Sequence, residues 1–175
     1  LMGLEGCGFL YIRRESMGHL EPRTAGWLSH QDGLGFLFEG GGLLDYGRPL
    51  KETAEFVEGG AYNTVGFAAL EASLDILQEL GVEGIFSHAG QFIDRLEEGM
   101  EELGFQSRRS PWAEGRSCSL ALGVPDGCSL PGLVERLDRE GISCSMPDGM
   151  LRFSPHWPNS LDEVPMVLEA VRRTV

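Results

Sequence analysis

The sequence predicts an α+β fold for its C-terminal part, preceded by two long helices and a glycine-rich irregular stretch. Apolar residues recur at helical spacing between about residues 63 and 103, and apolar positions alternate over 117–124. After residue 105 the expected order is strand, helix, strand, strand, helix. Strands interleaved with covering helices are typical of one α+β layer.

The first 60 residues show little periodicity. The run from Gly8 to Arg13 is apolar and aromatic, and it predicts a buried strand. Residues 15–60 are rich in glycine and proline, including Gly33-Leu34-Gly35 and Gly40-Gly41-Gly42. Irregular stretches of this length are typically functional or mobile.

Two consecutive helices follow the irregular stretch. Asn63 is a suitable N-cap for the first helix, and Gly81 ends it. The second helix runs from about Val82 to Leu103, where apolar residues recur at helical spacing before Gly104. Glutamates near its end predict a solvated face, and they are Glu97, Glu98, Glu101 and Glu102.

The remaining elements are shorter. In the strand at Ser117–Val124, inward positions are expected at Cys118, Leu120, Leu122 and Val124. The other expected elements are a helix at Ser129–Glu140, strands at Ile142–Met146 and Met150–Ser154 joined by a turn at Pro147-Asp148-Gly149, and a last helix that begins with the capping box Ser160-Leu161-Asp162-Glu163.

Composition narrows the class of protein. The chain of 175 residues has 14 basic and 27 acidic residues and a net charge of −13, which argues against nucleic acid or an anionic membrane as a partner. Its four cysteines form no C-x-x-C pair, which indicates free thiols in a reducing, cytoplasmic compartment and no zinc site. No signal peptide is visible, and no apolar run reaches the roughly 20 residues of a membrane span.

The glycines at 3, 6 and 8 allow tight turns before the first strand, but they carry little weight alone. Two further stretches are candidates for binding chemistry. The first runs from Glu58-Gly59-Gly60-Ala61 to Gly66, at the start of the first long helix, where free backbone N–H groups bind anions such as phosphate. The alternative is an ordinary glycine-rich helix start. The second is Arg152, in the middle of an apolar strand, whose planar guanidinium suits a carboxylate. A structural salt bridge and a position on the solvent face are the alternatives for Arg152.

Taken together, three motifs resemble the class V aminotransferase family. These motifs are Met2-Gly3 with Gly6-Cys7-Gly8, then Gly60-Ala61-Tyr62-Asn63, then Arg152-Phe153-Ser154-Pro155-His156 with Asn159, in the order and spacing of the family. This group of pyridoxal-phosphate enzymes includes cysteine desulfurases, isopenicillin-N-epimerase-like proteins and kynureninases. The resemblance covers nearly the whole chain and implies a remnant of the large α/β cofactor-binding domain at 1–60, linking helices at 61–104, and the small α+β C-terminal domain at 105–175.

The resemblance also implies site residues and partners. Arg152 matches the arginine that holds the substrate α-carboxylate, and the substrate would be an amino acid. Gly60 and Ala61 match a Gly-Thr pair that reaches the pyridoxal phosphate of the neighbouring subunit in a homodimer, although Ala61 lacks the hydroxyl group. The lysine that forms the Schiff base would lie just before Leu1. The only lysine, Lys51, matches no cofactor position, so the chain alone is not expected to catalyse.

The reaction type stays open at this point. Transamination, β-elimination and epimerisation all begin with the same orientation of the substrate carboxylate. Cysteine desulfurases need a catalytic cysteine on a mobile loop, and Cys144 is better interpreted as a small core residue. A non-catalytic relative that serves as an interaction or regulatory subunit is the main alternative, and a small stand-alone binding domain is a third.

Overall fold

The computed structural model describes residues 4–38 and 47–174, and the chain divides into two compact units. The first unit ends at Ile76 and the second begins at Leu77. The dividing point lies within the helix Thr64–Leu80. No helix in the described ranges is long and apolar enough to cross a membrane.

The regular elements of the first unit are short up to the long helix that begins at Thr64. These short elements are the 3₁₀ turns η1 (Arg14–His19), η2 (Trp27–Ser29) and η3 (Ala54–Val57) and the short helix α1 (Gly35–Phe38). Its tightest contact joins η2 to the segment after η3, because a side chain at Gly26 would place its Cβ 1.8 Å from the Gly59 carbonyl oxygen. Buried Ser29 stabilises this contact by accepting a 3.0 Å hydrogen bond from the Gly26 N–H.

The predicted strand at Gly8–Arg13 is wrong. These residues form no regular element, and the side chains of Phe9 and Tyr11 are 77% and 79% exposed. No described segment pairs with this run, and a strand without a partner is not stable in water. The predicted irregular character of 15–60 is confirmed where the structure describes it, whereas Gly40-Gly41-Gly42 lies outside the described residues.

The two long helices are confirmed as α2 (Thr64–Leu80) and α3 (Val82–Glu102). Asn63 caps α2, because its Oδ1 accepts a hydrogen bond of 2.9 Å from the Gly66 N–H. Between the helices Gly81 has a φ of 74°, a conformation that favours glycine and breaks the helical path. Along α3 the buried side chains share one face, and they are Ala89, Phe92, Ile93, Leu96 and Met100.

The second unit combines α3 with a small antiparallel sheet and two more helices. The sheet has three strands in the order β1 (Gln106–Ser107), β2 (Leu120–Gly123) and β3 (Leu151–Phe153), and the helices are α4 (Leu130–Arg139) and α5 (Glu163–Arg172). Two 3₁₀ turns, η4 (Ala113–Gly115) and η5 (Pro147–Gly149), lie in the connections. The α+β character predicted for this region is therefore confirmed.

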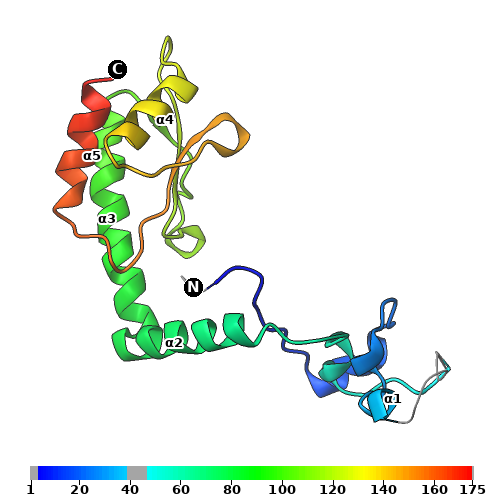
Figure 1. Cartoon of the computed structure of the whole chain (residues 1–175). Helices are drawn as coiled ribbons and strands as arrows, with labels where there is room; N and C mark the ends of the chain where they lie inside the picture. Colours follow the sequence, from blue (N-terminus) through cyan, green and yellow to red (C-terminus); the bar gives the residue numbers. More distant parts are fainter. Residues whose placement is uncertain (1–3, 39–46, 175) are drawn as a thin grey trace. The chain divides into compact units, whose positions relative to one another are not determined.

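Helices cover one face of the sheet. Leu120 and Leu122 of β2 and Leu151 and Phe153 of β3 are buried in one core with the apolar faces of α3, α4 and α5. Helices α3 and α5 lie side by side in this layer (Figure 1). Because α3 supplies much of the core, it belongs to the same compact unit as the sheet. The domain boundaries proposed at residues 60 and 104 stay a prediction about the whole protein.

The strands near residue 145 differ from the prediction. Only Ser145 of the predicted strand Ile142–Met146 pairs, through an isolated bridge to Arg152 with N···O distances of 2.7 and 3.1 Å. The predicted turn is confirmed as η5, where Asp148 has a φ of 53° and the Met150 N–H donates to the Pro147 carbonyl oxygen. This turn reverses the chain between Ser145 and Arg152, the one residue pair described there. The sequence did not predict β1, which has only two residues.

The last helix begins later than predicted. The Ser160 N–H donates to the Glu163 carboxylate over 2.8 Å, which is one half of the expected capping box. The Ser160 hydroxyl instead accepts from the Asp162 N–H at 3.3 Å, so the other half does not form. As a result α5 begins at Glu163, and Pro165 falls in its first turn, where a proline is tolerated.

Candidate functional site

Arg152 lies on the open face of the sheet, away from the helices. It is the central residue of β3, and its neighbours Leu151 and Phe153 are buried on the helical side while Arg152 is exposed. Its Nε donates a 3.1 Å hydrogen bond to the Ser145 hydroxyl, which holds the guanidinium beside the edge of the sheet. No carboxylate among the described residues forms an ion pair with Arg152. Among the described residues, therefore, no salt bridge holds Arg152 in place.

The floor around Arg152 is built from small side chains. Ala121 of β2 lies directly opposite Arg152 in the ladder, and Ser119 and Ser154 hydrogen-bond to each other over 2.9 Å on the same face. Beyond Ala121 the backbone of Arg108 continues the line of β1, because its N–H donates to the Ala121 carbonyl oxygen at 2.9 Å. This open face therefore carries small and mostly polar side chains in its middle, with Arg108 and Arg152 at its two sides.

The neighbouring Arg109 points to the opposite face, where acids neutralise it. Its Nη1 binds Asp94 at 2.5 Å and Glu97 at 2.9 Å on α3, and its side chain is only 6% exposed. Burial lowers the pKa of Arg109, but the hydrogen bonds to these two carboxylates outweigh that effect and leave the pKa raised. Glu97 also accepts from the Ser107 hydroxyl, so it joins α3 to β1 and is not part of a wholly solvated face as the sequence predicted. Glu98, Glu101 and Glu102 are exposed as expected.

Gly60 and Ala61 lie in the first unit, between η3 and the start of α2. Within the described residues, the backbone N–H groups of Gly60 and Ala61 donate no hydrogen bond. Ala61 is exposed, and a Cβ at Gly60 would meet only the Trp27 indole nitrogen, at 3.9 Å. The loop therefore presents free amide donors that an anion can reach, although the hydroxyl of a threonine is missing.

A cavity of about 510 Å³ opens beside this loop. Ala61 and Tyr62 line it together with Trp27 and Lys51. The Lys51 ammonium is bound to Glu55 at 3.1 Å, so its charge is largely neutralised there. The Tyr62 hydroxyl donates to Glu58, and this hydrogen bond raises the pKa of Tyr62. The cavity walls thus offer an aromatic ring, an indole and backbone amides.

The cysteines of the second unit are not activated thiols. Cys144 is half-buried and packs against the core, and burial raises its pKa, with a smaller contribution from Asp138. Burial also raises the pKa of Cys118 and Cys128. A raised pKa lowers the thiolate fraction at neutral pH and thereby the reactivity of each thiol. The interpretation of Cys144 as a small core residue is confirmed, although it lies outside any strand.

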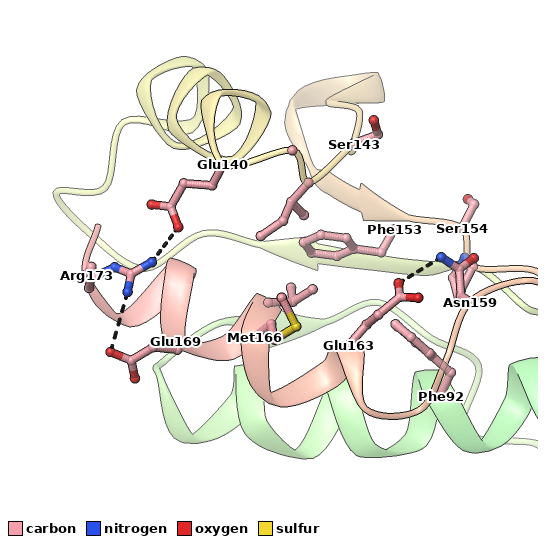
Figure 2. A pocket seen from close by; sticks show the side chains of 14 residues that line it. Phe92, Glu140, Ser143, Phe153, Ser154, Asn159, Glu163, Met166, Glu169 and Arg173 are labelled. Carbon is pink, nitrogen blue, oxygen red and sulfur yellow. Dashed lines mark hydrogen bonds and ion pairs between the residues drawn. The ribbon is translucent and has the colours of Figure 1, made fainter.

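A cavity of the second unit lies on the helical side of the sheet, between the segment around Ser143 and α5 (Figure 2). It encloses about 720 Å³, with Phe92 and Phe153 among its apolar walls. Its charged groups are already paired, because Arg173 binds Glu140 and Glu169, and Glu163 accepts a hydrogen bond of 3.0 Å from the Asn159 amide.

This cavity is a poor site for a carboxylate. Three of its lining side chains are carboxylates, and its single arginine, Arg173, is bound to two of them. Arg152 does not line it. A negatively charged substrate is therefore better accommodated on the open face of the sheet than in the larger cavity.

The structure places the predicted site residues in different units. Arg152 belongs to the second unit, and Gly60 and Ala61 belong to the first. The sequence did not single out Ser145, the hydrogen-bond partner of Arg152, or Arg108 on the same sheet face. It offers no strand signal for Arg108, because Gln106, Ser107 and Arg108 are all polar and β1 has only two residues.

Comparison with known families gives a match over most of the chain. The family model described as aminotransferase class-V matches residues 1–150. A probable cysteine desulfurase of Pyrococcus abyssi is 28% identical over 191 residues, which cover 99% of this chain and 44% of the relative. An uncharacterized aminotransferase of Bacillus subtilis, YcbU, is 22% identical and is covered to 42%. The chain thus spans less than half the length of these relatives.

Solved structures agree in fold. The cysteine desulfurase CsdA of Escherichia coli has a TM-score of 0.80 at 20% identity, over 98% of this chain and 43% of that protein. The apo cysteine desulfurase of Thermococcus onnurineus has a TM-score of 0.77 at 24% identity, over 94% of this chain and 42% of that protein. At these identities the likeness establishes the fold alone. A third neighbour, a variant of C-DES with glycine linked to its PLP cofactor, has a TM-score of 0.71 at 18% identity and covers 94% of this chain and 41% of that protein.

Proposed function

This chain belongs to the class V aminotransferase family, and we propose that it forms the substrate-carboxylate-binding part of a pyridoxal-phosphate enzyme that acts on an amino acid. The proposal concerns the whole protein, because the chain spans only 44% of a relative such as the Pyrococcus abyssi protein. Its main support is the position of Arg152, an exposed arginine on an open sheet face with no carboxylate partner among the described residues.

Arg152 is well suited to hold an α-carboxylate. The hydrogen bond from its Nε to Ser145 leaves the terminal nitrogens of the guanidinium as donors and restricts its orientation. A guanidinium binds a carboxylate through parallel N–H···O bonds, which fixes the ligand in position as well as attracting it. In the proposed enzyme Arg152 orients the substrate so that its α-carbon meets the reacting groups, and Ser145 is a positioning residue.

Gly60 and Ala61 are the residues of this chain that would hold the cofactor phosphate. Their N–H groups are free among the described residues and lie just before the positive end of α2. Backbone donors of this kind fit a phosphate group even without the threonine hydroxyl that Ala61 lacks. Pyridoxal phosphate, when bound, supplies an electron sink for bonds at the α-carbon of the substrate. By resemblance to the family, the phosphate belongs to the neighbouring subunit of a homodimer.

The proposed reaction is transamination, elimination or epimerisation, without a nucleophilic thiol. Desulfuration would need a reactive cysteine near Arg152, and the nearest in sequence, Cys144, packs against the core with a raised pKa. The turn η5 between Cys144 and Arg152 is short and closed by the hydrogen bond between Met150 and Pro147. The proposed function therefore does not include the desulfurase activity for which some of the relatives are named.

Binding measurements on the full-length protein test the proposal. Arg152→Ala should raise the dissociation constant for an amino acid by roughly tenfold to a hundredfold, because a hydrogen bond between charged groups contributes about 1.5–3 kcal/mol. The affinity for pyridoxal phosphate should change less than about twofold, since a different unit holds its phosphate in the proposal. Cofactor absorbance reports both quantities.

The matched control is Arg136→Ala, which removes the same charge from an exposed position on α4. It should change neither affinity. Equal losses of amino-acid and cofactor affinity in Arg152→Ala, or no loss in either, would remove Arg152 from the site. A full-length protein that takes up no pyridoxal phosphate would instead support the alternative of a non-catalytic interaction or regulatory subunit.

A further inference from the structure

The open face of the sheet carries a second arginine, Arg108, whose side chain the proposed function does not use. Arg108 directly follows β1, and its N–H donates to the carbonyl oxygen of Ala121. Ala121 in turn lies opposite Arg152. The three residues therefore form one row across the sheet, with an arginine at each end and alanine between them.

The sheet separates Arg108 from its neighbour Arg109. Arg109 lies on the helical face and is bound to Asp94 and Glu97. Arg108 lies on the open face and is exposed, and its one described side-chain contact is a weak 3.5 Å hydrogen bond to Gln106. In the described residues no carboxylate forms an ion pair with Arg108. The positive charge of Arg108 is therefore available to a ligand, whereas that of Arg109 is not.

The row between Arg108 and Arg152 carries no large side chain. A Cβ at Gly123 would lie 3.6 Å from Nη2 of Arg108, so the guanidinium extends over a residue without a side chain. Ala121 adds only a methyl group. Because adjacent strands are spaced by about 4.8 Å, the Cα atoms of Arg108 and Arg152 lie about 10 Å apart. Two long side chains at this spacing can contact both ends of one short ligand.

We propose that Arg108 is a specificity-determining residue that binds a second anionic group, on the side chain of the substrate, while Arg152 holds the α-carboxylate. This inference rests on the proposed function of Arg152. The substrate class would be amino acids, or the corresponding keto acids, whose side chain ends in a carboxylate or a phosphate. A neutral or basic side chain would leave the Arg108 charge unmatched at this surface.

Calorimetric titration of the full-length protein loaded with pyridoxal phosphate tests this inference. Glutarate carries two carboxylates, butyrate carries one, and 3-phosphonopropionate combines a carboxylate with a phosphonate. The wild-type protein should bind one of the two doubly anionic probes at least about tenfold more tightly than butyrate. Tightest binding of glutarate would identify a dicarboxylic substrate, and tightest binding of 3-phosphonopropionate would identify a phosphorylated substrate.

Variants separate the roles of the two arginines. Arg108→Ala should weaken the preferred dianion about tenfold and leave butyrate within about twofold, whereas Arg152→Ala should weaken all three probes. Arg108→Lys should retain part of the preference, and Arg136→Ala should retain all of it. The backbone N–H of Arg108 is unchanged by substitution, so the pairing with Ala121 remains.

Equal binding of butyrate and both dianions by the wild-type protein would overturn the role of Arg108. Equal weakening of butyrate and the dianion by Arg108→Ala would also overturn it. In both cases the proposed function would stand if Arg152→Ala still weakened butyrate. Failure of Arg152→Ala to weaken butyrate would overturn the proposed function instead.

Discussion

The chemistry of each arginine on the sheet depends on which face it occupies. Arg109 lies against α3, where two carboxylates surround it, and its role there is to join helix and sheet. Arg152 and Arg108 lie on the open face, where no described carboxylate pairs with them. Because β-strand side chains alternate between faces, consecutive arginines have different roles.

Burial of a single thiol, that of Cys144, makes the stability of the protein depend on pH. Cys144 packs against the core, and burial raises its pKa above the ordinary value of 9.0. The folded protein therefore binds the thiol proton more tightly than the unfolded chain does. The stabilisation from this difference is fully present below the unfolded pKa and is lost as the pH rises through the higher folded pKa.

We expect the stability of the wild-type protein to depend more steeply on alkaline pH than that of Cys144→Ala. The variant loses packing at every pH, but it has no thiol at position 144 to titrate. Urea unfolding of both proteins between about pH 8 and about pH 11 measures the difference between their free energies of unfolding. This difference should shrink as the pH rises above the thiol pKa. Parallel curves for the two proteins would show that burial of Cys144 does not perturb its titration.

At the scale of elements, α3 supports the sheet that carries the candidate site, without contributing a residue to that site. Its buried face packs against the helical side of the sheet, and its Asp94 and Glu97 bind Arg109 next to β1. Helix α5, the last helix of the unit in sequence, packs against α3. The close contact between them is at Gly99, where a Cβ would lie 2.3 Å from Cδ1 of Leu168.

A pair of glycine substitutions in α3 measures this contact. Gly90→Ala should raise the free energy of unfolding by about 0.5–1 kcal/mol, because alanine favours a helix and nothing lies within 4 Å of the added Cβ. Gly99→Ala gains the same propensity but must displace Leu168, and overpacking costs about 1–3 kcal/mol, so the net effect should be destabilising. Urea unfolding measures the free energy of unfolding of both variants. Equal stabilisation of the two would mean that Leu168 and α5 move aside without a loss of stability.

At the scale of the whole molecule, the two units differ in how much of their chain is packed. The second unit has a continuous core of fifteen buried residues, whereas in the first unit the described buried side chains are Leu28, Ser29 and Leu70. The segment 8–13 is largely exposed, and the structure records no hydrogen bond donated by its backbone amides.

Hydrogen exchange should reflect this difference. Amides in the interior of α3 and in β2 should exchange at least about a hundredfold more slowly than those of residues 8–13, because they open only when the core of the second unit opens. Mass spectrometry of peptides from each region measures the rates. The full-length protein serves as the comparison, since slow exchange of 8–13 there would show that other parts of the protein pair with this segment. Similar fast exchange in both regions of this chain would contradict the packing of the second unit.

The sequence by itself determined the helices, the turn at Pro147–Gly149 and the α+β character of the second unit. Helices α2, α3 and α4 were predictable because their periodicity and caps are local, as the Asn63 cap shows. The family was also predictable, since the stretch Gly60-Ala61-Tyr62-Asn63 that resembles it is short and local, and the family model matches residues 1–150.

Only the tertiary structure decided the pairing of strands and the environment of each polar side chain. Residues 8–13 have the composition of a strand but no described partner, and β1 is too short for a clear pattern yet pairs with β2. Likewise the sequence left Arg152 between a salt bridge, a solvent-facing position and a carboxylate site. Strand pairing and side-chain partners depend on residues far apart in the chain, so Ser145, Ala121 and Arg108 became neighbours only in the folded sheet.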